Sequence, residues 1–143
     1  SQIEASRVGA DVSVGPYAHL RENCRLDSAV HIGNFVELKN ASVGSGTWLS
    51  HLSYVGDADL GARCNVGCGA VTVNFDRVEK HRTTVGDDAF IGCNTSLVAP
   101  VSVGNGAYIA AGSVITEDVP AQALGIARSR QSNKRDWAAK HKK

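Results

Sequence analysis

The chain has 143 residues, of which 43% are hydrophobic. That share is enough for a packed core and excludes an intrinsically disordered chain, while the length fits one compact domain or a single repeat array. No apolar run approaches the roughly 18 residues of a membrane span. The polar start Ser1-Gln2-Ile3-Glu4 is unlike a signal peptide. We therefore expect a cytoplasmic protein without a membrane partner.

Charge is unevenly distributed along the chain, although the net charge is only +1. Residues 1–127 hold 8 Lys or Arg against 13 Asp or Glu, whereas residues 128–143 hold 7 against a single Asp. We expect the basic C-terminal segment to be a solvated chain end. Contact with a phosphorylated small ligand is the first alternative, and a nucleic-acid arm is the second and less favoured one.

The four cysteines are Cys24, Cys64, Cys68 and Cys93, and no two of them form a C-x-x-C pair. A zinc knuckle is therefore not expected, and we assign no residue to a metal. Reduced thiols are the usual state in the cytoplasm.

An aliphatic side chain recurs every six residues, and this is the strongest pattern in the sequence. Glycine often follows it directly, and the residue four positions later is usually small or β-branched. Spacings of three and four, which a helix needs, are missing. The period predicts short strands, three to a coil, with successive coils stacked in parallel about 4.8 Å apart. We expect this array to span residues 3–119 as a triangular prism of the all-β class.

The period assigns the aliphatic positions to three faces of the prism. The first face begins its strands at Val8, Leu26, Val43, Leu60, Val85 and Val103. The second begins at Val14, Ile32, Leu49, Val66, Ile91 and Ile109. The third begins at Leu20, Leu38, Val55, Thr72, Leu97 and Ile115. Two five-residue steps shorten the same corner in neighbouring coils, which supports this register.

A column of residues lies two positions past the starts of the second face. Its members are Pro16, Asn34, His51, Cys68, Cys93 and Ala111. Every member beyond His51 is small, which predicts a narrow groove in which an extended pantetheine arm could lie, with the histidine at its head. Small side chains at tight corners are the alternative explanation, although they do not account for the histidine.

Two cations, Arg21 and Lys39, occupy the position after the third-face starts and are 18 residues apart. Like charges at about 5 Å repel by about 1 kcal/mol even in water, so a phosphate between them would explain the pair. The alternative is two solvated side chains that splay apart. Tyr54 and Glu37 lie near the same corner and could hydrogen-bond a sugar or the Lys39 ammonium group.

Residues 73–84 interrupt the period, and we predict a loop that projects from a corner. Such loops are commonly functional, although a tolerated surface insertion is the alternative. After Pro120 the period ends. We expect a C-terminal extension over 120–143 that is partly helical near Trp137-Ala138-Ala139-Lys140.

Several longer strings go beyond a generic repeat. They are Val14-Gly-Pro-Tyr-Ala-His-Leu-Arg21, His31-Ile-Gly-Asn-Phe-Val-Glu-Leu-Lys39, His51-Leu-Ser-Tyr-Val-Gly-Asp57, Asn65-Val-Gly-Cys-Gly-Ala-Val-Thr-Val-Asn-Phe-Asp76, Leu97-Val-Ala-Pro-Val101 and Gln131-Ser-Asn-Lys134. Together they resemble the C-terminal acetyltransferase domain of the bifunctional N-acetylglucosamine-1-phosphate uridyltransferase/glucosamine-1-phosphate acetyltransferases. The resemblance covers about residues 1–137 and implies the left-handed parallel β-helix of the hexapeptide acyltransferases.

The resemblance also implies an activity, namely acetyl transfer from acetyl-CoA to the 2-amino group of glucosamine 1-phosphate. The product would serve UDP-N-acetylglucosamine, peptidoglycan and cell-wall synthesis, and no metal would be needed. By motif, His51 would be the general base, and the sugar phosphate would be held by Arg21, Lys39, Tyr54, Asn65 and Lys80. The coenzyme site would be lined by Cys68, Asn74, Phe75, Cys93, Ala111 and Arg128. The implied assembly is a homotrimer with sites between subunits, in which the C-terminal extension completes the coenzyme pocket.

The sequence departs from the family pattern at several positions. Arg21-Glu22-Asn23 stands where the family usually has Arg-Pro-Gly, and Asn74-Phe75-Asp76-Arg77 where it has Asn-Tyr-Asp-Gly. Cys68 and Cys93 replace the usual alanine and serine. These changes concern substrate affinity more than the class of reaction.

Four other functions fit parts of the sequence. The first is a hexapeptide acyltransferase with another acceptor, such as a serine, an antibiotic, a nucleotide-linked sugar or another amine. The second is a zinc carbonic anhydrase on the same helix, which is disfavoured because its three histidines do not converge here. The third is a non-catalytic β-helix subunit, and the fourth is an acyl-enzyme mechanism through Cys68 or Cys93, for which no activating group is visible.

Overall fold

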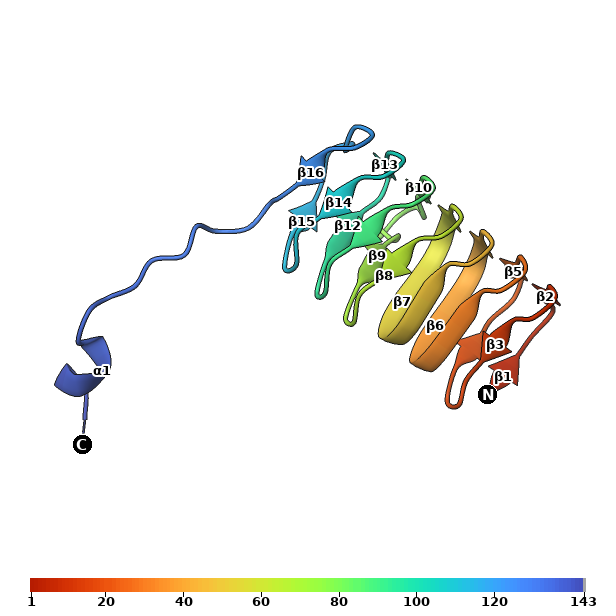
Figure 1. The fold of residues 1–143 in the computed structure, drawn as a ribbon, viewed down its shortest axis with the longest axis horizontal. Helices are drawn as coiled ribbons and strands as arrows, with labels where there is room; N and C mark the ends of the chain where they lie inside the picture. Colours follow the sequence, from red (N-terminus) through yellow and green to blue (C-terminus); the bar gives the residue numbers. More distant parts are fainter. Residues whose placement is uncertain (143) are drawn as a thin grey trace.

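A computed structural model describes residues 1–142 as a prism of stacked coils from which an extended C-terminal arm departs (Figure 1). Each coil contributes strand to three faces, and strand segments on the same face of successive coils pair in parallel. The elements are β1 (Gln2–Ile3), β2 (Arg7–Val8), β3 (Ser13–Val14), β4 (His19–Leu20), β5 (Arg25–Leu26), β6 (His31–Val43), β7 (Trp48–Leu60), β8 (Asn65–Val66), β9 (Val71–Val73), β10 (Thr83–Val85), β11 (Phe90–Ile91), β12 (Ser96–Val98), β13 (Val101–Val103), β14 (Tyr108–Ile109), β15 (Val114–Ile115), β16 (Leu124–Gly125) and α1 (Trp137–Lys140). The expected left-handed parallel β-helix is therefore confirmed.

The three predicted faces are confirmed by the strand pairing. The first face holds β2, β5, β10 and β13, the second β3, β8, β11, β14 and β16, and the third β1, β4, β9, β12 and β15. The long strands β6 and β7 continue around two corners and pair with each other on all three faces. We name the corner between the second and third faces the His51 corner, and the corner between the third and first faces the Lys39 corner.

The core is the stack of aliphatic side chains inside the prism. Leu20 and Leu38, paired on the third face, are fully buried, as are Ile32 and Leu49 on the second. Burying each such side chain contributes about 1.5–3 kcal/mol. Neighbouring coils approach so closely that a Cβ on Gly33 would lie 1.7 Å from the carbonyl oxygen of Ser50.

One core position is polar. Thr72, in the third-face stack, is 3% exposed, and its hydroxyl donates to the Gly56 carbonyl oxygen at 3.0 Å and accepts from the Gly56 N–H at 2.8 Å. The hydroxyl thus pairs with both backbone polar groups of Gly56 inside the prism.

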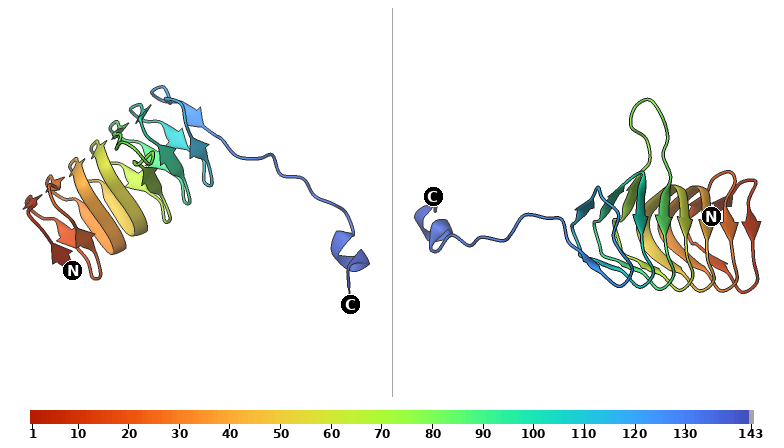
Figure 2. Two further views of the ribbon diagram at one scale, coloured as in Figure 1. Left: turned by 180° about the vertical axis from the view of Figure 1, so that it is seen from behind. Right: turned by 90° about the horizontal axis from the view of Figure 1, so that it is seen from above.

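A loop runs from the end of β9 at Val73 to the start of β10 at Thr83, within the range predicted, and it stands clear of the prism in the right-hand view of Figure 2. An antiparallel bridge pairs Phe75 with Lys80 across the loop. The Asp76 carboxylate accepts from the N–H groups of Val78 and Glu79 and contacts Nε2 of His81 at 2.7 Å. These contacts, with the hydrogen bond to Glu79 foremost, lower the pKa of Asp76 to about 2.

The base of the loop is anchored by Arg82. Its guanidinium group donates to both oxygens of the Asp59 carboxylate at 2.7 Å, and it also reaches the carbonyl oxygens of Ala58 and Asn40 at 3.3 Å. The hydrogen bonds from Arg82 lower the pKa of Asp59 to about 2. Two hydrogen bonds between a guanidinium group and a carboxylate fix the orientation of the two groups as well as their distance. The loop therefore leaves the prism in a defined orientation.

The parallel ladder continues past residue 119, where the sequence pattern placed its end. Val119 bridges to Val103, and β16 pairs with β14 through Leu124 and Gly125. The six-residue period is lost after Pro120, but the backbone still completes the coil. The predicted helical segment is confirmed as α1, which the arm carries away from the prism (Figures 1 and 2). No helix within residues 1–142 is long and apolar enough to cross a membrane.

Candidate functional site

The column that carries His51 follows the strand pairing of the second face. His51 pairs with Asn34, and the pairs Leu49–Val66 and Val66–Ile91 place Cys68 and Cys93 on the next two coils. Backbone bonds tie the coils together here, from Asn94 N–H to the Cys68 carbonyl at 2.8 Å and from Gly112 N–H to the Cys93 carbonyl at 2.8 Å. His51 and Cys93 are exposed and Cys68 is half-buried. The predicted alignment of the imidazole with small side chains is therefore confirmed.

The far end of this column meets the C-terminal arm. The guanidinium of Arg128 donates to the carbonyl oxygen of Ala111 at 2.7 Å, so the first residues of the arm turn toward the His51 corner. A hollow of about 610 Å³ lies beside it, lined by Ile126, Arg128, Ser129, Arg130 and Gln131. Arg128 thus lies beside one of the small residues with which the family resemblance grouped it.

Three cations gather at the Lys39 corner. The pairing of Leu20 with Leu38 places Arg21 and Lys39 on neighbouring coils, as predicted. Lys80, from the loop, lies against Lys39, and the proximity of the two ammonium groups lowers the pKa of Lys80. A cluster of this kind is stabilised by a bound anion, and a phosphate with several acceptor oxygens suits it.

Asp57, which was not among the predicted site residues, holds this corner together. It is 7% exposed, and its carboxylate accepts from Nδ2 of Asn40 and of Asn74, both at 2.8 Å, and lies 3.6 Å from Nζ of Lys39. Burial opposes the charged form, but the two amides and Lys39 outweigh it, so the pKa of Asp57 is lowered. Asn40 and Asp57 are one coil apart in the sequence, so the repeat could have predicted their contact.

Two other predicted residues take part in the same network. Glu37 pairs with Arg21, with Oε2 3.3 Å from Nη1, rather than with Lys39 as the sequence analysis had allowed, because Asp57 occupies the space beside that ammonium group. The Tyr54 hydroxyl accepts from Nδ2 of Asn74 at 3.2 Å.

The structure separates some residues that the family resemblance grouped together. Asn74 and Phe75 belong to the loop at the Lys39 corner and not to the column with Cys68 and Cys93. Asn65 lies on the second face, between Trp48 and Phe90. Five residues, at most about 17 Å of chain at 3.3 Å per residue, separate His51 from the Lys39 corner, and the backbone turns at Leu52 within them. The two corners bound the third face but do not meet.

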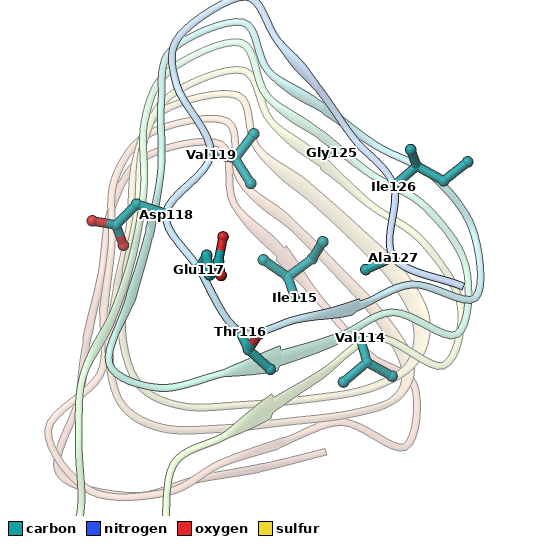
Figure 3. A pocket seen from close by; sticks show the side chains of 9 residues that line it. All are labelled: Val114, Ile115, Thr116, Glu117, Asp118, Val119, Gly125, Ile126 and Ala127. Atoms are coloured by element: carbon teal, nitrogen blue, oxygen red, sulfur yellow. The ribbon is translucent and has the colours of Figure 1, made fainter. Parts of the chain in front are cut away.

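A further hollow, of about 320 Å³, is the open C-terminal end of the prism. Figure 3 looks into this hollow along the axis of the prism, with the coils seen as triangles. Residues 114–119 and 125–127 line it. It contains no residue assigned to chemistry by the sequence. Among residues 1–142, no three His, Cys, Asp or Glu side chains converge as metal ligands would.

Known proteins share the repeat and match the chain over nearly its whole length. The family model for bacterial transferase hexapeptide (six repeats) matches residues 82–117. The bifunctional protein GlmU of Caldicellulosiruptor saccharolyticus is 56% identical over 142 residues, which cover 99% of this chain and 31% of that protein. GlmU of Brevibacillus brevis is 60% identical over 135 residues, covering 94% and 29%.

The chain thus spans about a third of the length of the curated relatives that it matches. The resemblance inferred from the motifs is confirmed, because the chain corresponds over nearly its whole length to the C-terminal part of these proteins.

Solved structures show the same fold. A perosamine N-acetyltransferase from Caulobacter crescentus, in complex with CoA and GDP-perosamine, superposes with a TM-score of 0.71 at 25% identity. The match covers 85% of this chain and 54% of that one. The serine acetyltransferase CysE of Neisseria gonorrhoeae, at 24% identity and a TM-score of 0.57, shares the fold.

Proposed function

We propose that the chain transfers an acetyl group from acetyl-CoA to the 2-amino group of glucosamine 1-phosphate in the cytoplasm, for the synthesis of UDP-N-acetylglucosamine and cell-wall precursors. The observation that carries this proposal is the pair of corners that bound the third face. One presents an exposed histidine above small side chains, and the other presents three cations, of which Lys39 pairs with the buried carboxylate of Asp57. The 56–60% identity to GlmU proteins supports the same activity.

His51 acts as the general base in this proposal. The sugar amine attacks the thioester carbonyl while the imidazole accepts a proton from the amine, and the tetrahedral intermediate collapses with release of the coenzyme A thiolate. The protonated imidazole then returns the proton to the leaving sulfur. An exposed imidazole is suited to both steps near neutral pH, and no covalent acyl-enzyme is needed.

Binding is divided between the two corners. Arg21, Lys39 and Lys80 hold the phosphate, and Tyr54 with Asn65 contacts the sugar. The pantetheine arm lies along the small residues of the column beyond His51. The coenzyme contacts come from Cys68, Cys93, Ala111 and Arg128, with Asn74 and Phe75 from the loop.

The separation of these groups supports the homotrimer that the family resemblance implies. Up to about 17 Å of chain lies between His51 and the Lys39 corner, so a compact substrate reaches both more readily when they come from different subunits. The second face also exposes Trp48 and Tyr108, each 51% accessible, which an interface would cover. We therefore place each active site between two chains.

Complementation tests this arrangement. His51→Ala and Lys39→Ala chains should each be inactive, but co-expressed chains should form mixed trimers in which some sites carry both wild-type residues. Recovery of acetyl transfer in the mixture, with a trimer mass by ultracentrifugation, supports shared sites. A mixture as inactive as its components contradicts them.

The activity is tested by thiol release from acetyl-CoA with glucosamine 1-phosphate as acceptor. We expect His51→Asn to lower kcat by about 100-fold or more, the usual contribution of a general base, while acetyl-CoA still binds. His31→Asn, on the second face, serves as the matched control and should retain turnover. Near-normal turnover by His51→Asn would remove this residue as the base.

The acceptor is tested separately with a panel of amines. Because three cations lie at the Lys39 corner, glucosamine 1-phosphate should be a far better acceptor than unphosphorylated glucosamine. Arg21→Ala should raise the KM for glucosamine 1-phosphate more than the KM for acetyl-CoA. A preference for a nucleotide-linked amino sugar instead would favour the alternative suggested by the perosamine enzyme.

A further inference from the structure

Cys68 and Cys93 occupy the same position on neighbouring coils of the His51 corner. The pair Val66–Ile91 fixes their register, and the Asn94 N–H bonds the Cys68 carbonyl oxygen at 2.8 Å. Strands paired in this way lie about 4.8 Å apart, within the 4.4–6.8 Å between Cα atoms that disulfides span. Disulfides also need their Cβ atoms about 3.5–4.5 Å apart, so a closing of the two coils by a few tenths of an ångström lets oxidation join the two sulfurs.

Accessibility distinguishes this pair from the other two cysteines. Cys93 is exposed and Cys68 half-buried, whereas Cys24 and Cys64 are 3% and 2% exposed. Burial raises the pKa of Cys24 and of Cys64, which disfavours the reactive thiolate. The Cys64 thiol is also engaged with the Gly86 carbonyl oxygen at 3.0 Å. An oxidant in solution thus meets Cys93 first and Cys68 next.

We infer that Cys68 and Cys93 form a redox-sensitive dithiol, a modification site that bridges the column of small residues beyond His51 when it is oxidised. The oxidant is a low-molecular-weight disulfide such as oxidised glutathione. The Cys93 thiolate attacks one of its sulfurs and releases the first small thiol. The Cys68 thiolate then attacks the Cys93 sulfur and releases the second. Two protein thiols lose two protons and two electrons, and the small disulfide is reduced to two thiols.

The consequence for activity rests on the proposed function. A disulfide between these coils lies across the column that the pantetheine arm would follow, directly below the imidazole. Oxidised chains should then fail to bind acetyl-CoA, and a dithiol reductant should restore binding. The control is specific to this chain, because the alanine and serine usual in the resembling family cannot form the bond.

The bond itself is tested without any activity measurement. The intact chain is incubated with oxidised glutathione, and its free thiols are counted after denaturation together with its mass. We expect two of the four thiols to disappear, with a mass loss of about two units and no attached glutathione. Cys68→Ala and Cys93→Ser should abolish this loss, whereas Cys64→Ala should retain it. Four free thiols, or glutathione left on both cysteines, overturns the proposal.

Inhibition is measured as the ratio of activity after and before oxidation within each variant. We expect that ratio to fall by about tenfold or more in the wild type, because only the unoxidised fraction stays active, and to return with reductant. It should stay near one in Cys93→Ser. A disulfide that forms without inhibition overturns the effect on coenzyme binding but leaves the modification site intact. A chain with no acetyl transfer before oxidation refutes the proposed function separately.

Discussion

Replacing Asp57 by asparagine removes the charge that faces Lys39 while keeping the shape of the side chain. The two side chains are only 10% and 11% exposed, and their charged atoms lie 3.6 Å apart. Removing one partner costs about 3–5 kcal/mol for a fully buried pair but about 0–1 for an exposed one. The asparagine also offers one acceptor oxygen to two amide donors, Asn40 and Asn74, which adds about 1 kcal/mol. We expect a total loss of about 3 kcal/mol in the free energy of unfolding.

The assay is urea unfolding at pH 7, followed by circular dichroism at equal chain concentrations. Asp88→Asn is the matched control, because Asp88 pairs with Arg63 at 2.8 Å but both side chains are more than half exposed. The control should lose no more than about 1 kcal/mol. If Asp57→Asn is as stable as the control, Asp57 does not hold the Lys39 corner together.

The same pair gives a pH dependence with a definite sign. The pKa of Asp57 is lowered in the folded chain, so its contribution is complete above the unfolded value of about 3.9 and is lost as the pH falls through the folded value. The stability difference between wild type and Asp57→Asn should therefore shrink below about pH 4. A difference that stays constant down to pH 2 would contradict the charge-based explanation.

Other contacts yield further tests. Arg82→Ala frees the loop from Asp59. Because both side chains are over 40% exposed, we expect little loss of stability. Steady-state kinetics should show a larger increase in KM for glucosamine 1-phosphate than in KM for acetyl-CoA, each relative to the wild type. Thr72→Val leaves both polar groups of Gly56 unpaired and should cost about 1–3 kcal/mol by urea unfolding. Leu38→Ala, which opens a cavity at a fully buried position, should cost about 2–5 kcal/mol. An unchanged KM for Arg82→Ala, or an unchanged free energy of unfolding for Thr72→Val or Leu38→Ala, would contradict the corresponding prediction.

The alignment of the columns could be predicted because burial sets the period. Each coil must place an aliphatic side chain inside the prism, so the spacing of Leu20, Leu38 and Val55 fixes their neighbours as well. His51 above Cys68, and Arg21 beside Lys39, followed from counting alone. The loop was visible because its polar residues break the count.

Side-chain partners could not be predicted from the same count. The repeat places Glu37 near two cations, but which one it pairs with depends on the space already taken by Asp57. The continuation into β16 was missed because Leu124 and Gly125 pair through backbone groups, whose hydrogen bonds leave no mark on the hydrophobic period. Asn65 lies on the second face, and the third face separates it from the Lys39 corner. The six-residue period shows which residues stack in one column but not how far apart two columns lie.

The insertion between β9 and β10 leaves the coils on either side in unbroken register, with Val85 above Leu60 and Ile91 above Val66. Corners of this prism therefore accept extra chain without cost to the interior. Such an appendage could be exchanged for another of different length and chemistry while the scaffold stays constant. This architecture therefore allows the corners to vary while the stacked strands stay the same.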